Sequence, residues 1–108
     1  MLNINKSIEE TRMDIALEGR LDTTTSPKLE EEIKADIAGI KELNFDLSSL
    51  AYISSAGLRV LLAAQKIMNE QGAMTVKNVS DEIMEIFDMT GFSEILTIVQ
   101  PEAEAAAE

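Results

Sequence analysis

The chain has 108 residues, a length typical of one domain with a single hydrophobic core. It contains no cysteine and no histidine, which excludes disulfides, thiolate chemistry and a serine–histidine–acid catalytic unit built from this chain alone. Twenty acidic and nine basic residues give a formal charge of −11, which disfavours binding to nucleic acid or to an anionic membrane. The sequence has neither a signal-peptide pattern nor an apolar run of membrane-spanning length, so a cytoplasmic location is predicted.

The N-terminal residues predict a β-hairpin. Apolar side chains alternate with polar or small ones over residues 13–17, the period of a strand with one buried face. Gly19 is expected to stop this strand. Residues 2–7 alternate more weakly and are expected to pair with it, with residues 9–12 as the turn.

A helix is predicted next, with Ser26 as its N-cap and Pro27 at its first helical position. Gly39 is expected to end this helix in the left-handed conformation. Residues 43–47 then alternate as a second strand with one buried face. The apolar stripe of the helix consists of Leu29, Ile33, Ile37 and Ile40.

The second half of the chain is predicted to continue the alternation of helices and strands. A long and largely apolar helix is expected from Ser55 to Gln71, and a short strand around residues 74–76. Ser80 is expected to cap a further helix, which Gly91 ends. Residues 95–99 are predicted to form the last strand.

The predicted order is therefore β-β-α-β-α-β-α-β, within one domain that spans residues 1–100. Helices that alternate with strands indicate parallel pairing through crossovers, to which the hairpin adds an antiparallel edge. We expect an α/β fold with a mixed sheet of four to five strands and amphipathic helices mainly on one face. Residues 101–108 form an acidic alanine- and glutamate-rich tail that is predicted to be disordered.

The most informative stretch covers residues 46–62. It predicts a strand that ends at Asp46, a short loop, and a helix that Ser54 and Ser55 open. A serine hydroxyl at such a boundary is exposed, close to free backbone N–H groups and the positive end of the helix dipole. A phosphate group would be stabilised at this position.

This stretch resembles the signature segment of the STAS domain, the fold shared by bacterial anti-sigma factor antagonists and sulfate-transporter tails. In that family a partner kinase phosphorylates the serine two residues before the helical glycine, which here corresponds to Ser55 before Gly57. Residues 19–22 are similar to the family's Gly-x-Leu-Asp turn, so the resemblance places Asp22 near the phosphorylated serine. Asp46 matches the acid that ends the strand before the loop.

The resemblance implies a non-enzymatic anti-sigma factor antagonist in a partner-switching system. The unmodified domain would bind an anti-sigma factor that is also a serine kinase, and the kinase would phosphorylate Ser55 with its own ATP. A separate serine phosphatase would reverse the modification, and no cofactor or metal is expected on this chain. The expected partner-binding residues are Asp22, Thr23, Ser49, Ala51, Tyr52, Ser54, Ser55, Ala56, Gly57 and Arg59.

Three of these residues keep a second interpretation. Many antagonists carry an aspartate directly before the phosphorylated serine, where this chain has Ser54 and thus a competing hydroxyl. Asp22 is also typical of a turn residue that bonds its own backbone. Gly57 is equally compatible with tight packing where the loop meets the helix.

Two other functions remain open. A STAS subunit of an ABC-type membrane transport complex would use the same surface as a constitutive protein contact. An enzyme with Ser55 as its nucleophile is disfavoured, because no general base is available nearby by residue type.

Overall fold

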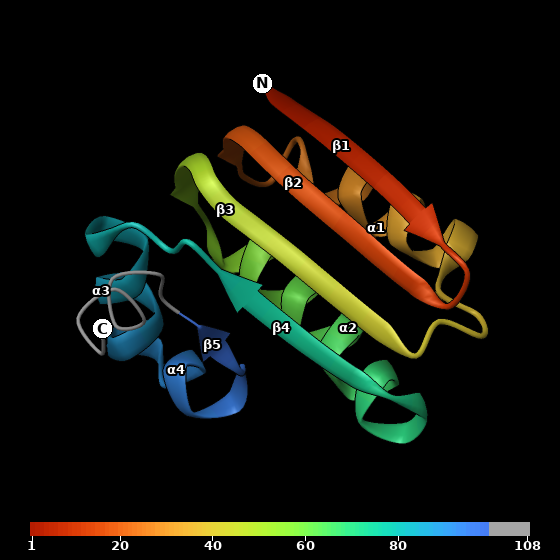
Figure 1. The fold of residues 1–108 in the computed structure, drawn as a ribbon. Helices are drawn as coiled ribbons and strands as arrows, with labels where there is room; N and C mark the ends of the chain where they lie inside the picture. The colour runs from red at the N-terminus through yellow and green to blue at the C-terminus, as the bar shows by residue number, and fades with distance from the viewer. Residues whose placement is uncertain (100–108) are drawn as a thin grey trace, which may run out of the picture.

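Residues 1–99 are described by the computed structural model, in which a five-stranded sheet packs against helices (Figure 1). The predicted tail of residues 101–108 and the predicted domain end at residue 100 lie outside the described residues. Among the described residues, no helix combines the length and the apolar character needed to cross a lipid bilayer. The elements are β1 (Leu2–Glu9), β2 (Arg12–Leu21), α1 (Ser26–Asp36), β3 (Glu42–Ile53), α2 (Ser55–Gln71), β4 (Ala73–Lys77), α3 (Asp81–Thr90), α4 (Phe92–Ile95) and β5 (Ile98–Val99).

The sheet has the strand order β1-β2-β3-β4-β5. Strands β1 and β2 form an antiparallel hairpin, and the other neighbours pair in parallel. Helical crossovers connect the parallel strands, as parallel pairing requires. The predicted mixed α/β fold and its N-terminal hairpin are confirmed, with α4 as an additional element.

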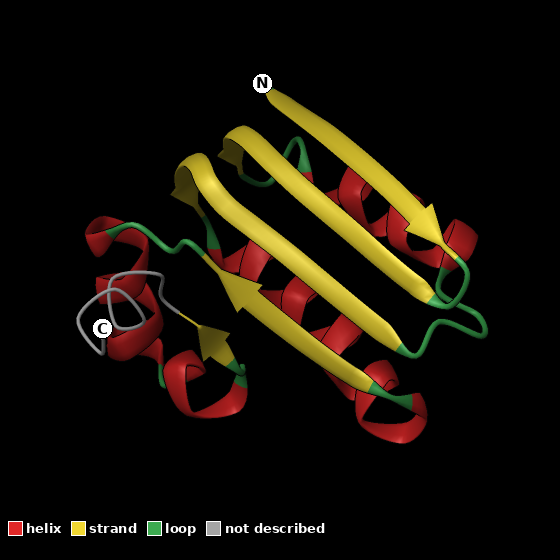
Figure 2. Cartoon of the chain, in the orientation of Figure 1, coloured by secondary structure: helices red, strands yellow, loops and turns green. Residues whose placement is uncertain are grey.

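The helices leave one face of the sheet uncovered. In Figures 1 and 2, α1 and α2 lie behind the sheet, whereas α3 and α4 lie beside β4 and β5. Lys6 of β1 connects the sheet to α1, because its ammonium group pairs with Glu32 at 2.7 Å and with Asp36. The hydrogen bonds that Lys6 donates to these carboxylates, the one to Asp36 first, raise the pKa of Lys6 above its usual value. The prediction that helices cover mainly one face is confirmed.

The core lies between the sheet and the helices. In β2, the side chains of Met13, Ile15 and Leu17 are at most 1% exposed, as their alternation predicts. Phe45 of β3 and Phe87 of α3 are completely buried. Each of these large apolar side chains contributes about 1.5–3 kcal/mol through removal from water.

Strand β3 is longer than the sequence indicates. It passes through Asp46 and continues to Ile53, so the predicted strand end at Asp46 and the loop after it are wrong. The register of β3 against β2 shifts twice, after Ala16 and after Gly19, and each shift places an additional residue in β3. The buried side chains in this half of β3 therefore occur at every third position: Leu47, Leu50 and Ile53.

The boundaries of α1 also differ from the prediction. Thr25 rather than Ser26 occupies the N-cap position, without a capping bond from its side chain. The hydroxyl of Ser26 instead donates to the carbonyl of Asp22 at 2.6 Å. The helix ends at Asp36, and Gly39 adopts its left-handed φ of 83° in the connection that follows.

Gly19 does not end β2, which continues to Leu21. Gly19 has a φ of 106°, and an added Cβ would lie 2.2 Å from the carbonyl oxygen of Met1. The glycine therefore lets the first residue approach β2. At the other end of the chain, Ser80 caps α3 and Gly91 ends it as predicted, whereas α4 occupies the start of the predicted last strand.

Candidate functional site

Ser54 is the N-cap residue of α2. Its hydroxyl oxygen accepts a hydrogen bond from the N–H of Gly57 at 3.4 Å. Its own N–H donates to the carbonyl of Leu21 at 2.9 Å, which holds the start of α2 at the end of β2. Because the cap satisfies an otherwise free N–H of the first turn, the Ser54 hydroxyl is already used by the fold.

Ser55 is the first residue of α2, and its side chain is exposed. Among residues 1–99, its hydroxyl takes part in no hydrogen bond. No acidic residue stands in the first turn of α2, so no carboxylate of that turn neutralises the positive end of the helix dipole. Of the two adjacent serines, Ser55 is thus the one with a free and accessible hydroxyl.

Gly57 brings the first turn of α2 close to the sheet. A Cβ at this position would lie 2.7 Å from Cγ of Leu21 and 2.9 Å from Cγ1 of Ile53. Both neighbours are buried, so neither side chain has free space to move into. The packing interpretation of Gly57 therefore applies. This packing sets the distance between the first turn of α2, with Ser55, and the sheet.

Asp22 organises the turn between β2 and α1. Its carboxylate accepts hydrogen bonds from the Thr24 hydroxyl at 2.7 Å and from the N–H groups of Thr24 and Thr25 at 3.0 and 3.1 Å. The bond from the Thr24 hydroxyl, followed by the backbone bonds, lowers the pKa of Asp22 below its usual value. Asp22 is therefore a turn residue that bonds its own backbone, which was one of its two interpretations.

Two side chains beside this turn form a stacked pair. The Arg20 guanidinium lies 4.4 Å from the centre of the Tyr52 ring, and its Nε is 3.8 Å from a carboxylate oxygen of Asp22. Tyr52 is 37% exposed. An exposed aromatic ring held by a cation is a typical anchor in protein interfaces.

The other predicted contact residues lie around the same end of the sheet. Ser49 and Ala51 are exposed on the second half of β3 rather than in a loop. Thr23 is exposed in the turn after β2. Thr23, Ala56 and Arg59 share one groove of about 210 Å³ between the start of α1 and the first turns of α2.

Sequence reasoning missed the residues that α1 contributes to this groove. Ser26, Pro27 and Glu30 form its other wall. The Ser26-Pro27 pair indicated where α1 begins, but nothing local in the sequence indicates that this helix start lies against α2. The order of elements alone does not specify which helix ends become neighbours.

Asp46 does not belong to this site. It lies on the uncovered face of the sheet, where its carboxylate accepts hydrogen bonds from the Ser48 N–H at 2.9 Å and the Asn78 amide at 3.0 Å. Burial acts to raise the pKa of Asp46, but these hydrogen bonds outweigh it and the pKa is lowered. The carboxylate thus connects β3 to the end of β4.

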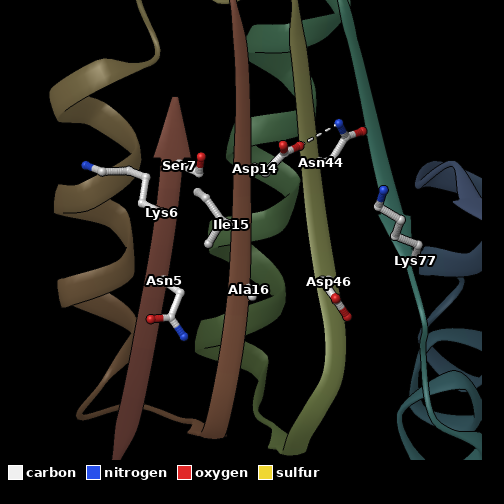
Figure 3. Close-up of a pocket in the computed structure, with 9 residues that line it drawn as sticks. All are labelled: Asn5, Lys6, Ser7, Asp14, Ile15, Ala16, Asn44, Asp46 and Lys77. Carbon is white, nitrogen blue, oxygen red and sulfur yellow. Dashed lines mark hydrogen bonds between the residues drawn. The ribbon is translucent and has the colours of Figure 1, made fainter. Parts of the chain in front are cut away.

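A larger hollow of about 310 Å³ occupies the same uncovered face (Figure 3). Figure 3 shows Asp14 and Asn44 on adjacent strands, joined by a hydrogen bond of 2.8 Å, with Lys77 on the next strand. These polar side chains alternate with the core residues of their strands. Lys77 is exposed, Asp14 is half-buried, and Asn44 is buried between its neighbours. The described residues contain no group of three histidine, cysteine, aspartate or glutamate side chains that could hold a metal ion.

The chain is similar to proteins of one known family. The family model described as the STAS domain matches residues 3–105. The anti-sigma-B factor antagonist of Listeria monocytogenes is 32% identical over 110 residues, which cover 95% of this chain and 95% of that protein. The anti-sigma-B factor antagonist of Bacillus subtilis is 28% identical over 100 residues and covers 90% of this chain and 92% of its own length.

Solved structures show the same fold. An anti-sigma factor antagonist from Mycobacterium paratuberculosis superposes with a TM-score of 0.82 at 21% identity, over 91% of this chain and 85% of that chain. The Bacillus cell fate determinant SpoIIAA in its phosphorylated form gives a TM-score of 0.72 at 16% identity, over 98% of this chain and 100% of that chain.

Proposed function

The chain belongs to the STAS domain family, and on that basis we propose that it is an anti-sigma factor antagonist controlled by phosphorylation of Ser55. In its unmodified form the domain binds an anti-sigma factor that is also a serine kinase, which frees the sigma factor. The kinase transfers phosphate from its own ATP to Ser55, and a separate serine phosphatase removes it. The domain acts as a cytoplasmic, non-catalytic binding protein in this cycle.

The free hydroxyl of Ser55 carries the proposal. Ser55 is exposed at the first position of α2, whereas the Ser54 hydroxyl is held by the Gly57 N–H. A kinase requires a hydroxyl that its active site can reach and that does not stabilise the substrate's own fold. This difference supports Ser55 over the competing Ser54 as the acceptor.

The partner surface is proposed to surround Ser55. It includes the exposed half of β3 with Tyr52, the turn at Thr23, and the groove that Arg59 lines. A phosphate adds about −1.5 to −2 charges at the centre of this surface. Its hydration opposes docking, because removal of a doubly charged group from water costs free energy.

Phosphorylation is not expected to refold the domain. The phosphate would lie at a helix N-terminus, where the dipole contributes about 0.3–1 kcal/mol of stabilisation to a negative group. Binding falls tenfold for each loss of about 1.4 kcal/mol, so a change confined to the interface is sufficient to release the partner.

The experiment is incubation of the purified domain with its kinase and ATP, followed by intact-mass and tandem mass spectrometry. We expect one phosphate on Ser55, none on Ser55→Ala, and retained modification of Ser54→Ala. Kinase binding should weaken at least tenfold after modification. Full modification of Ser55→Ala at Ser54 would contradict the acceptor assignment, and equal binding of both forms would contradict the switch.

The same experiment separates the transport-complex alternative. A constitutive subunit of such a complex co-purifies with an ATPase subunit and gains no phosphate. Its affinity for that ATPase subunit is the same before and after incubation with the kinase. That pattern would replace the antagonist proposal.

A further inference from the structure

We propose that Arg59 binds the phosphate of phosphorylated Ser55. Its guanidinium then pairs with the modified residue and no longer takes part in the partner surface. This inference rests on the proposed phosphorylation of Ser55 and names the side chain that receives the charge. The pair lies within a single helix, so the modified domain forms it without any change in the backbone.

The spacing of the two residues brings their side chains together. Ser55 and Arg59 are four residues apart in α2, so they lie on the same face of the helix, with Cβ atoms about 5–6 Å apart. Helical side chains tilt towards the N-terminus, so a long residue covers the turn that precedes it. The exposed position of Ser55 therefore lies within reach of the long Arg59 side chain.

Arg59 is available for a new partner, unlike the other arginines of the described chain. It is exposed and forms no ion pair within residues 1–99. Arg12 pairs with Glu9 and Asp14, and Arg20 is held between Tyr52 and Asp22. The described cations thus include one free guanidinium, which lies one helical turn from Ser55.

The groove beside α2 gives the Arg59 side chain room to move. Its walls include Ala56 and Val60 of α2 and Glu30 of α1. A small alanine next to the arginine leaves room for the guanidinium to move towards the first turn. Because a guanidinium binds phosphate through two parallel hydrogen bonds, the dianion is a stronger partner than a neighbouring carboxylate.

The pairing gives phosphorylation a second effect on partner binding. The phosphate introduces negative charge and also removes a positive side chain from the groove that the partner would contact. A partner that pairs an acidic side chain with Arg59 loses that contact in the modified form. Arg59→Gln should therefore reduce the ratio of the two binding constants, unmodified over phosphorylated, by a factor of about 2.

The direct test uses domain in which phosphoserine is incorporated at position 55 during translation, so no kinase is required. The second pKa of the phosphate is measured by 31P NMR in the native sequence, in Arg59→Gln and in Lys66→Gln. Lys66 is the matched control, because it is an exposed cation of the same helix, distant from Ser55, with no ion pair in residues 1–99. We expect Arg59→Gln alone to raise this pKa by about 0.2–0.4 units, the shift that corresponds to a helical i,i+4 ion pair.

The side-chain Nε–H signal of Arg59 gives a second measurement on the native sequence. It should shift when phosphoserine replaces serine, while the amide spectrum outside the first turns of α2 stays unchanged. Equal phosphate pKa values in all three proteins, or an equal rise in Lys66→Gln and Arg59→Gln, would overturn the assignment.

These outcomes are independent of the kinase experiment. If the kinase modifies Ser55 but Arg59→Gln leaves the phosphate pKa unchanged, the proposed function stands and this inference fails. If no kinase modifies Ser55 but the pair forms in the translated phosphoprotein, the geometry is correct and the proposed regulation fails.

Discussion

Gly57 should be the position where one methyl group most disturbs the candidate site. In Gly57→Ala, the new Cβ would lie 2.7 Å from Leu21 Cγ and 2.9 Å from Ile53 Cγ1. Leu21 and Ile53 are 0% and 2% exposed, so the first turn of α2 has to move away from the sheet instead. Ser55 would move with it.

The magnitude follows from two opposing effects. Overpacking a buried contact costs about 1–3 kcal/mol. Alanine is favoured over glycine in a helix by up to about 1 kcal/mol. The net expectation is a loss of about 1–2 kcal/mol of unfolding free energy, or a fall in Tm of about 5–15 °C for a domain of this size.

Urea and thermal denaturation of four proteins test this reasoning: the native sequence, Gly57→Ala, Leu21→Ala and the double variant. Leu21→Ala alone should cost about 2–5 kcal/mol, since it leaves a cavity. Leu21→Ala also removes Cγ and Cδ2, two of the atoms that the new Cβ would meet. Gly57→Ala should therefore cost at least about 1 kcal/mol less in the Leu21→Ala background than in the native sequence. An equal cost in both backgrounds, or a stabilised single variant, would refute the packing role of Gly57.

Three further predictions concern stability. In urea titrations, Ser54→Ala should lower the unfolding free energy by about 0.5–2 kcal/mol through loss of the cap, whereas Ser55→Ala should stay within about 0.5 kcal/mol of the native value. A larger loss in Ser55→Ala than in Ser54→Ala would contradict the assignment of Ser54 as the cap. Asp22 has a lowered pKa, so its ionised form stabilises the fold at neutral pH, and this stabilisation is lost as the pH falls from 3.8 through the folded-state value. The Tm difference between the native protein and Asp22→Asn should thus be present at pH 7 and disappear in acid, and a constant difference would contradict it. Lys6→Met should cost about 1 kcal/mol or less, since the carboxylates of Glu32 and Asp36 are more than one third exposed, and the cost should shrink in salt of about 1 M if the ion pairs are responsible.

The turn bonds of Asp22 change how its partner contacts should be tested. Reversing the charge of Asp22 would remove hydrogen bonds to Thr24 and Thr25, so weaker partner binding would accompany lower stability. Thr23 is exposed in the same turn and is the cleaner position for a charge substitution.

The sequence predicted those parts of the fold that local chemistry decides. The alternation of Met13, Ile15 and Leu17 identified a strand with one buried face. Ser80 and Gly91 identified the two ends of α3. The same reasoning failed for β3, because its two register shifts depend on how it pairs with β2. An interrupted period of two looks the same in a bulged strand and in a loop.

The candidate site was predictable in part for the same reason. The preference of serine for helix starts placed Ser54 and Ser55 at the beginning of α2, but only the observed hydrogen bond to Gly57 distinguishes the capping hydroxyl from the free one. Prediction of the groove wall at Glu30 would have required knowledge of how α1 packs against α2.

The hydrogen bond from the Ser54 N–H to the Leu21 carbonyl joins two chain segments that are distant in the sequence. A kinase that contacts both the turn at Thr23 and the start of α2 recognises a surface that exists only after folding. A synthetic peptide covering residues 46–62 has the complete local sequence and none of this surface, so it should be a poor substrate. Nascent, misfolded or denatured chains would likewise escape modification, and the pool of phosphorylated protein would report only on molecules that have completed their tertiary structure.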